Sequence, residues 1–416
     1  MQIKQKMPRL RFSEFNSSWE RLSISEFLID YVGGAPLKPE DFVAQGEYEV
    51  IPKKAIVPFG KMKLDDNGTF CSESFFTSYY KNTIDKSYLV TTLRDLVPSG
   101  PNIGYIVEFE SSKRFMLAQG VYGFKLDETK INRGFLIQFS NTWPYRKVMR
   151  RIMVGSTQVH IRNEDFFATE VPVPPVEEQK KVAEFLSTVD KKISLLKEKH
   201  ALLEQYKKGV MQKLFKQEIR FKDDSGSDFP NWQEKTMGQV LTPEIREINK
   251  PSEKYLALGV RSHMKGTFQK PDSDPDAIAM EKLYIVRPND LIVNITFAWE
   301  GAIAIAKPED NGGLVSHRFP TYTFKSDQAT HRFFRHIIQL KRFKHMLDLI
   351  SPGGAGRNRV LSKSEFLKLK WILPSVREQE KIAGFLDVID VKLSLLNEQI
   401  ELTQTFKKGL LQQMFV

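Results

Sequence analysis

Two stretches of the chain carry apolar residues at heptad spacing, and this pattern predicts two long helices. The first stretch, from Val176 to Phe215, contains no proline. Its two apolar rows are Val182, Val189, Leu196, Leu203 and Val210, then Leu186, Ile193 and Leu214, with His200 and Lys207 interrupting the second row. The second stretch repeats the seam with Ile382, Leu386, Ile389, Leu393, Leu396, Ile400, Leu410 and Met414. We expect helices over 176–216 and 376–416, and each needs a partner that covers its seam.

The two helical stretches are copies of one another. Residues 171–216 and 371–416 align without a gap and are identical at 20 of 46 positions, including Gln179 with Gln379 and Asp190 with Asp390. Upstream of each copy, a short basic and apolar lead-in reaches a tryptophan, Trp19 or Trp232. The chain therefore contains an internal repeat. Its expected parts are a globule at 1–175, a helix at 176–216, a second globule at 217–375 and a second helix at 376–416.

The globules show the pattern of mixed α+β domains. Short runs such as YIVEF, LIVNITF and FPTYTF lie between Gly, Pro and Asn residues and indicate strands, whereas 333–350 has helical spacing. Residues 87–97 and 283–293 each resemble a strand, a turn and a strand, with Asp95 and Asp290 as counterparts. The order of the strands does not follow from the sequence.

Connectivity predicts how the two helices pair. The second globule starts where the first helix ends and finishes where the second helix begins, and domain termini often lie close together. We therefore expect an antiparallel coiled coil with pseudo-two-fold symmetry that holds the globules apart; about 40 residues make a helix of roughly 60 Å. The alternatives are that each helix packs on its own globule or pairs with another copy of the chain.

Composition and charge narrow the class of protein. Apolar residues make up 41% and charged residues 27% of the chain, and the mean hydropathy is -0.36. There is no apolar run near the ~18 residues of a membrane span and no signal peptide, so we expect a cytoplasmic protein without membrane contact. The single cysteine, Cys71, excludes a disulfide framework and a multi-cysteine metal site. The net charge is +11, of which the globules carry +8, which favours a polyanionic partner.

Motifs of catalysis are absent from the sequence. It has no GxxxxGK[ST] loop, no strand-linked GxGxxG, no HExxH and no Asp/Asn-Pro-Pro-aromatic tetrapeptide. Residues 271–282 lack the Glu-x-Lys spacing of a metal-dependent nuclease, and the histidines are scattered. We therefore predict no catalytic residues and no metal site in this chain.

Basic and amide side chains in the predicted loops suit a reader of double-stranded DNA, because Lys and Arg bind phosphates while Arg, Asn and Gln bond to base edges. Taken singly, each of these residues also fits a solvated surface. Trp299 fits either a contact with a base or a place in the core, and we expect the core. The predicted DNA-binding residues are Lys53, Lys54, Lys61, Lys63, Gln119, Thr157, Gln158, His160, Arg261, His263, Lys265, His317, Arg318, Arg357, Asn358 and Arg359.

The paired segments VPPVEEQKKVAEFLSTVD and LPSVREQEKIAGFLDVID resemble the specificity subunits of Type I restriction-modification systems. The resemblance covers the full length and implies two target recognition domains, each followed by a conserved-region helix. It implies a bipartite, asymmetric DNA site with an unread spacer between the half-sites.

The same resemblance implies that the chain performs no chemistry and binds no cofactor. Two modification subunits would methylate adenine with S-adenosylmethionine, and restriction subunits would add ATP- and Mg-dependent translocation and cleavage. Modification subunits would dock near the helices, where we expect contacts from Gln179, Lys181, Gln379 and Lys381.

Two other classes of function remain open at this stage. One is a coiled-coil scaffold whose globules bind protein partners, and the other is a free-standing DNA enzyme. Salt dependence separates the first from a DNA reader, because affinity carried by phosphate contacts falls steeply with ionic strength. The enzyme predicts turnover by the purified chain alone.

Overall fold

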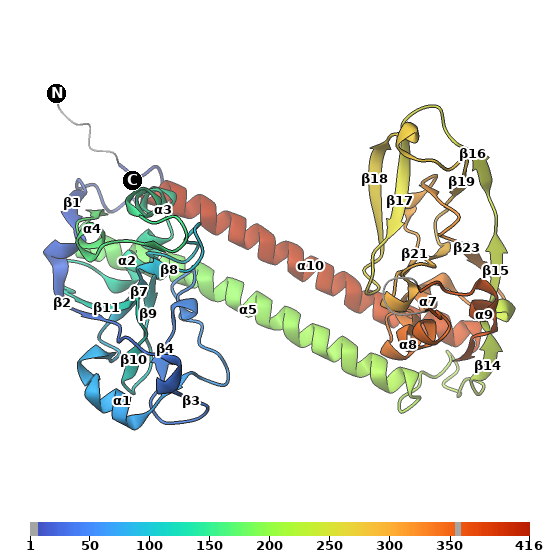
Figure 1. The fold of residues 1–416 in the computed structure, drawn as a ribbon, viewed down its shortest axis with the longest axis horizontal. Helices are drawn as coiled ribbons and strands as arrows, with labels where there is room; N and C mark the ends of the chain where they lie inside the picture. The colour runs from blue at the N-terminus through green and yellow to red at the C-terminus, as the bar shows by residue number, and fades with distance from the viewer. Residues whose placement is uncertain (1–6, 354–358) are drawn as a thin grey trace. The chain divides into compact units, whose positions relative to one another are not determined.

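The computed structural model describes residues 7–353 and 359–416, and the chain divides into two compact units. Unit 1 comprises Met1–His200 with Leu396–Val416, and unit 2 comprises Ala201–Leu395. The long helices are α5 (Val176–Phe215) and α10 (Val376–Met414), against expected ranges of 176–216 and 376–416 (Figure 1). Each unit thus contains one globule and a half of each long helix.

Unit 1 is built from short strands and four short helices before α5. Its helices are α1 (Glu73–Ser78), α2 (Arg133–Ser140), α3 (Trp143–Ile152) and α4 (Asn163–Phe167), with 3₁₀ turns η1 (Ile24–Phe27), η2 (Pro39–Asp41), η3 (Lys53–Ala55) and η4 (Tyr80–Asn82). Its strands are β1 (Glu20–Ser23), β2 (Leu28–Gly33), β3 (Phe42–Val43), β4 (Val50–Ile51), β5 (Phe70–Cys71), β6 (Thr83–Ile84), β7 (Leu89–Thr92), β8 (Arg94–Asp95), β9 (Ile106–Glu108), β10 (Phe115–Leu117), β11 (Val121–Leu126), β12 (Val159–His160) and β13 (Glu170–Val173).

Unit 2 repeats this plan with longer strands. Its helices are α6 (Met237–Val240), α7 (His331–Ile337), α8 (Lys341–Leu349) and α9 (Lys363–Lys368), with 3₁₀ turns η5 (Pro275–Ala277), η6 (Ala298–Glu300) and η7 (Pro308–Asp310). Its strands are β14 (Gln233–Thr236), β15 (Leu241–Glu244), β16 (Glu247–Asn249), β17 (Tyr255–Val260), β18 (Thr267–Ser273), β19 (Lys282–Ile285), β20 (Leu291–Val293), β21 (Ile303–Ile305), β22 (Leu314–Val315), β23 (Thr321–Phe324) and β24 (Lys370–Leu373).

Three sheets of unit 1 have counterparts in unit 2. The order β2-β11-β7-β9 in unit 1 matches β15-β23-β20-β21 in unit 2, and β4-β10-β6 matches β17-β22-β19 within a five-stranded sheet. In both smaller arrangements the first pair is parallel and the second antiparallel. A closing ribbon, β1 with β13 or β14 with β24, pairs the start of each globule with the strand before each long helix.

Each unit is layered. In unit 1 one core cluster joins α2 and the long helices to the sheet that contains β7 and β11, and a second cluster, with Val90 and Leu117, lies between this sheet and β4-β10-β6. Unit 2 has the same two clusters, with Ile292 and Val260 in the second. The prediction of two mixed α+β domains in tandem, each followed by a long helix, is confirmed.

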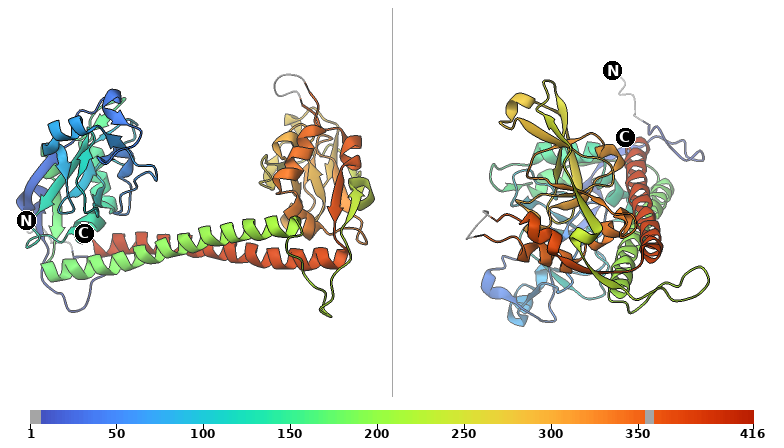
Figure 2. Two further views of the ribbon diagram at one scale, coloured as in Figure 1. Left: turned by 90° about the horizontal axis from the view of Figure 1, so that it is seen from below. Right: turned by 90° about the vertical axis from the view of Figure 1, so that its right-hand side faces the viewer.

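The long helices run antiparallel in both units, as expected. In unit 1 the buried residues Val182 and Leu186 of α5 share a core with Leu410 and Met414 of α10. In unit 2 the end of α5 packs in the same way against the start of α10, and Figure 2 shows the two helices side by side in each unit. The heptad rows therefore form the seam that the sequence indicated.

Polar residues that interrupt the seam make ion pairs across it. Lys407 Nζ lies 2.6 and 2.7 Å from the two carboxylate oxygens of Asp190, and only 1% of the lysine side chain is exposed. The repeat equivalent in unit 2, Lys207 with Asp390, has a distance of 2.5 Å and is more exposed. Burial lowers the pKa of Lys407, and the carboxylate of Asp190 opposes this shift.

The lead-in segment of each globule is tied to the start of its long helix. Arg11 donates from Nε and Nη2 to the fully buried carboxylate of Glu178, each at 2.6 Å. Arg220 binds the buried Glu378 in the same way, at 3.1 and 2.8 Å. The neighbouring rings repeat too: Phe12 packs edge-on against Phe185 at a centroid distance of 5.9 Å, and Phe221 packs against Phe385 at 5.5 Å.

None of the helices within 7–353 and 359–416 is long and apolar enough to cross a membrane.

Candidate nucleic-acid interface

Ten of the sixteen predicted DNA-binding residues lie in loops at equivalent sheet edges of the two units. Because the carboxyl ends of parallel strands meet at one edge, the loops that leave them lie together. In unit 1 these loops follow β4 and β10, and in unit 2 they follow β17 and β22. They hold Lys53, Lys54, Lys61, Lys63 and Gln119 in unit 1, and Arg261, His263, Lys265, His317 and Arg318 in unit 2.

One residue in each unit joins two of the predicted segments. In unit 1 the backbone of Leu93 donates to Gly120 O at 3.0 Å and accepts from the N–H of Ile161 at 2.9 Å. In unit 2 Ile295 donates to Arg318 O at 3.0 Å and accepts from Leu361 N–H at 2.8 Å. The segment with Thr157, Gln158 and His160 therefore lies beside the Gln119 loop, and Arg359 lies in the corresponding segment of unit 2.

The loop from Arg261 to Gly266 is held in a strained conformation. His263 and Met264 have positive φ angles of 60° and 55°, which residues other than glycine rarely adopt. Their N–H groups donate to the carbonyls of Glu300 and Gly301, each at 2.9 Å. Such strain persists where contacts enforce it and is typical of functional loops. The side chains of Arg261, His263 and Lys265 are exposed.

The equivalent loop of unit 1 reaches the end of α2 and the long helix α10. Phe59 also has a positive φ, 77°, and its N–H donates to Asn141 Oδ1 at 2.8 Å. Its ring lies 4.9 Å from Lys407 Nζ. Lys61 and Lys63 are exposed, Lys53 is half-buried, and Lys54 pairs with Asp65.

Arg359 and Trp299 lie against one another at the surface of unit 2. The guanidinium of Arg359 pairs with Asp348 at 2.7 Å, donates to Ser351 O at 3.0 Å and lies 5.2 Å from the Trp299 ring centre. Trp299 is half-buried at the surface, so its predicted place in the core is wrong. Arg357 and Asn358 lie outside the described residues.

The structure adds one exposed cation that sequence reasoning missed. Arg94, in β8, stands opposite His160 of β12, and its side chain lies against Gly120. It therefore borders Gln119 and His160. Nothing in the sequence distinguishes it from other surface arginines, since the pairing of β8 with β12 joins segments about 65 residues apart.

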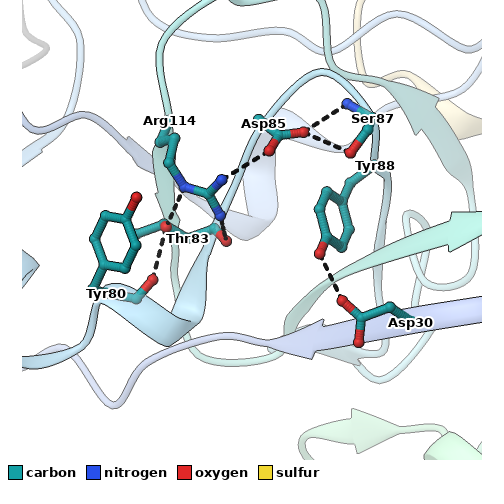
Figure 3. A network of polar contacts seen from close by, with 7 residues as sticks. All are labelled: Asp30, Tyr80, Thr83, Asp85, Ser87, Tyr88 and Arg114. Carbon is teal, nitrogen blue, oxygen red and sulfur yellow. Dashed lines mark hydrogen bonds and ion pairs between the residues drawn. The ribbon is translucent and has the colours of Figure 1, made fainter.

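Another basic side chain of unit 1 is committed to the fold. Arg114 donates to the hydroxyl and carbonyl of Thr83, each at 2.9 Å, and to Asp85 at 2.8 Å (Figure 3). The Ser87 hydroxyl, which donates to Asp85, lowers the pKa of that carboxyl. Burial and the bond to Asp30 raise the pKa of Tyr88 to about 12. We therefore leave Arg114 out of the DNA-binding set.

Two of the predicted partner contacts are wrong. Gln179 and Gln379 are fully buried. Gln179 accepts from the N–H of Asn132 at 2.7 Å and donates to the carbonyls of Lys130 and Pro174 at 3.0 and 2.8 Å. Gln379 makes the same three kinds of bond in unit 2, to Thr330, Gln328 and Pro374. These glutamines join helix to globule and are unavailable to a partner.

The other two predicted contacts, Lys181 and Lys381, stay predictions. Lys181 pairs with Glu14, and Lys381 with Asp224 at 2.8 Å. Both lysines therefore bind the lead-in segments while keeping at least a third of their side-chain surface exposed.

Replacing Gln179 by alanine is expected to lower the free energy of unfolding by about 2–3 kcal/mol, because three backbone groups lose their buried partner. Amide hydrogen exchange at the start of α2, where Asn132 donates to Gln179, measures the effect. The exposed Gln205 on the same helix provides a control, since Gln205→Ala removes an equal side chain from solvent. Equal exchange rates in the two variants would contradict the assignment.

A group of His and Asp side chains in unit 2 resembles a metal site, but cations already bind its carboxylates. Ligand atoms of His336, Asp387 and Asp390 lie within 4.8 Å of one another. Arg332 pairs with Asp387 at 2.8 Å and Lys207 with Asp390 at 2.5 Å. Burial lowers the pKa of His336. A metal ion would have to displace two cations, so this group serves as an ion-pair network between α7 and the long helices.

Comparison with known proteins gives matches along most of the chain. The sequence model of the family described as Type I restriction modification DNA specificity domain matches residues 16–205 and 244–404. The type I restriction enzyme MjaVIII specificity subunit of Methanocaldococcus jannaschii is 24% identical over 272 residues, which are 62% of this chain and 64% of that protein. The alignment thus spans less than two thirds of that relative.

Two further matches extend the comparison. The putative type I restriction enzyme MjaX specificity subunit of the same organism is 23% identical over 328 residues, 76% of this chain and 75% of that protein. The crystal structure of a Type I restriction-modification S subunit from M. genitalium has a TM-score of 0.59 at 17% identity and covers 99% of both chains. At this identity the structural match shows the fold alone.

Proposed function

The chain belongs to the family of Type I restriction-modification DNA specificity subunits, and we propose that it binds a bipartite, asymmetric site on double-stranded DNA. In this proposal each globule reads one half-site, and the long helices supply the unread spacer between them. The chain itself carries out no chemistry and binds no cofactor.

One observation carries the proposal: both units place polar loops at equivalent sheet edges, and the side chains in those loops differ. The loops that hold Lys61 and Gln119 in unit 1 correspond to the loops that hold Lys265 and Arg318 in unit 2. Lysine supplies phosphate affinity whatever the base sequence, whereas Arg, Gln and His discriminate between base edges. The two units thus share a scaffold but carry different loop side chains, which supports half-sites of different sequence.

The exposed surface of the long helices supports docking by two modification subunits. Apolar side chains that are more than half exposed recur at an offset of 200 residues: Leu202 and Tyr206 on α5 in unit 2, and Leu402 and Phe406 on α10 in unit 1. Their spacing of four places each pair on one helical face, which suits an amphipathic helix of a partner. We propose that these subunits methylate adenine with S-adenosylmethionine, and that restriction subunits use ATP and Mg.

A domain exchange tests the function. Residues 217–375 would be replaced by the corresponding domain of another specificity subunit, and the chain expressed with its modification subunits. The loops of unit 2 that hold Lys265 and Arg318, which we call its reading loops, lie within the exchanged range. Genome-wide mapping of methylated adenines is therefore expected to show one half-site changed and the other retained.

The reciprocal exchange of residues 1–175 is the control, and it should change the other half-site only. A methylated motif that stays the same after both exchanges would contradict base reading by the globules. Loss of both half-sites after a single exchange would contradict independent reading.

A further inference from the structure

A basic hollow lies beside the reading loops of unit 2. Its volume is about 560 Å³, and it is lined by Trp299, Lys341, Lys344, His345, Asp348 and Arg359. Four of these residues come from α8, which packs closely against η6, the turn that contains Trp299. The same turn anchors the strained Arg261 loop through Glu300. The hollow therefore adjoins the surface that we assign to base reading.

The positive charge of the hollow is not balanced by the protein. Among residues 7–353 and 359–416, no carboxylate lies within ion-pairing distance of Lys341 or Lys344. The first turn of α8 carries Lys341, Arg342 and Lys344 and has no acidic residue. The helix dipole disfavours cations at this end, so an anion beside these lysines would relieve their repulsion. A local arrangement that is unfavourable for folding is typical of a functional site.

The one acid of the hollow is already neutralised. Asp348 accepts from Arg359 at 2.7 Å through its side chain and at 2.9 Å through its carbonyl. Lys341 and Lys344 thus set the net charge, with His345 beside them. Arg359 also lies over the Trp299 ring, at 5.2 Å from its centre, and covers a face that a nucleobase would need for stacking. The hollow therefore suits a phosphate group better than a base.

We propose that this hollow binds phosphates of the DNA backbone beside the half-site read by unit 2. The proposal rests on the proposed function, since it assigns one part of the same DNA to a surface outside the reading loops. Lys341 and Lys344 supply phosphate affinity and carry no sequence information. Arg359 acts as a positioning residue that neutralises Asp348 and shapes the wall.

The test uses the full-length chain with Lys341→Gln and Lys344→Gln together. Binding is measured by fluorescence anisotropy over a series of salt concentrations, with a duplex that contains the mapped site and a matched duplex that lacks it. We expect affinity for both duplexes to fall about tenfold or more, and the slope of log affinity against log salt to decrease by about 2. The methylated motif is expected to stay the same.

The control is Lys368→Gln, which removes a charge from α9 outside the hollow and should leave affinity and slope unchanged. Circular dichroism and the thermal midpoint confirm that the variants fold. An unchanged salt slope in the double variant, or a changed motif, would overturn the proposal while leaving DNA recognition in place. Competition by adenosine monophosphate would instead indicate a nucleotide pocket and also overturn it. If the unaltered chain binds neither duplex, the proposed function falls and this proposal with it.

Discussion

Lys407→Met is expected to lower the free energy of unfolding by about 3–4 kcal/mol. The methionine keeps much of the apolar volume but removes the cation that Asp190 binds at 2.6 and 2.7 Å. Breaking a buried ion pair leaves an uncompensated charge, which is far more destabilising than the pair itself is stabilising. Gln138, which donates to Asp190 at 2.9 Å, offsets only part of the loss.

Native-state hydrogen exchange of α10 amides around Lys407 measures this effect, since it reports opening free energies without a two-state assumption. Lys207→Met is the matched control in unit 2, where 13% of the lysine and 37% of the Asp390 side chain are exposed. Water can solvate that carboxylate, so we expect a loss of only about 1 kcal/mol. Equal losses at the two positions would show that burial does not govern the strength of these pairs.

The second large effect is expected for Arg11→Met, at about 3 kcal/mol. Glu178 is fully buried, and Arg11 donates to both of its carboxylate oxygens. The variant therefore leaves a buried carboxylate without its cation, and protonating or hydrating that group requires the lead-in segment to open. Limited proteolysis within residues 7–18, followed by mass spectrometry, should detect the opening.

Arg220→Met is the control for this prediction, because the equivalent carboxylate keeps a second donor. Trp232 Nε1 donates to Glu378 at 3.2 Å, whereas Trp19 Nε1 is buried without a hydrogen-bond partner among the described residues. We expect a smaller loss in unit 2. If the second lead-in segment is cleaved as readily as the first, the tryptophan bond contributes nothing.

The helices could be predicted from the sequence, but the ion pairs between them could not. Heptad spacing is a property of one continuous stretch of sequence, so the sequence alone predicts the seam through Val182 and Leu186. Lys207 appeared only as an interruption of that seam. Its role depends on Asp390, which lies 183 residues away and contacts it only once the helices pair.

The same periodicity could have shown that Gln179 and Gln379 are buried and do not contact a partner. Gln179 lies three residues before Val182 and seven before Leu186, so it belongs to the apolar rows and faces the interior. Its polarity alone favours a surface position. A polar residue in phase with a buried row instead indicates a group with internal hydrogen-bond partners.

The interior of the globules was beyond the sequence because strand pairing is nonlocal. Asp95 and Asp290 are not counterparts: Asp95 follows β7, whereas Asp290 precedes β20, the strand equivalent to β7. The equivalence of the Lys61 and Arg261 loops was also hidden, because the connections after β4 and β17 differ in length. Only the shared parallel pairing shows that they occupy the same place.

The glutamine joints have a consequence for how such chains diversify. Gln179 and Gln379 bond to main-chain groups alone, and every amino acid other than proline offers the same N–H and C=O. Substitutions of the residues that supply these N–H and C=O groups, apart from proline at an N–H position, therefore leave the glutamine bonds in place. Each long helix can thus hold globule segments of different sequence through the same glutamine bonds.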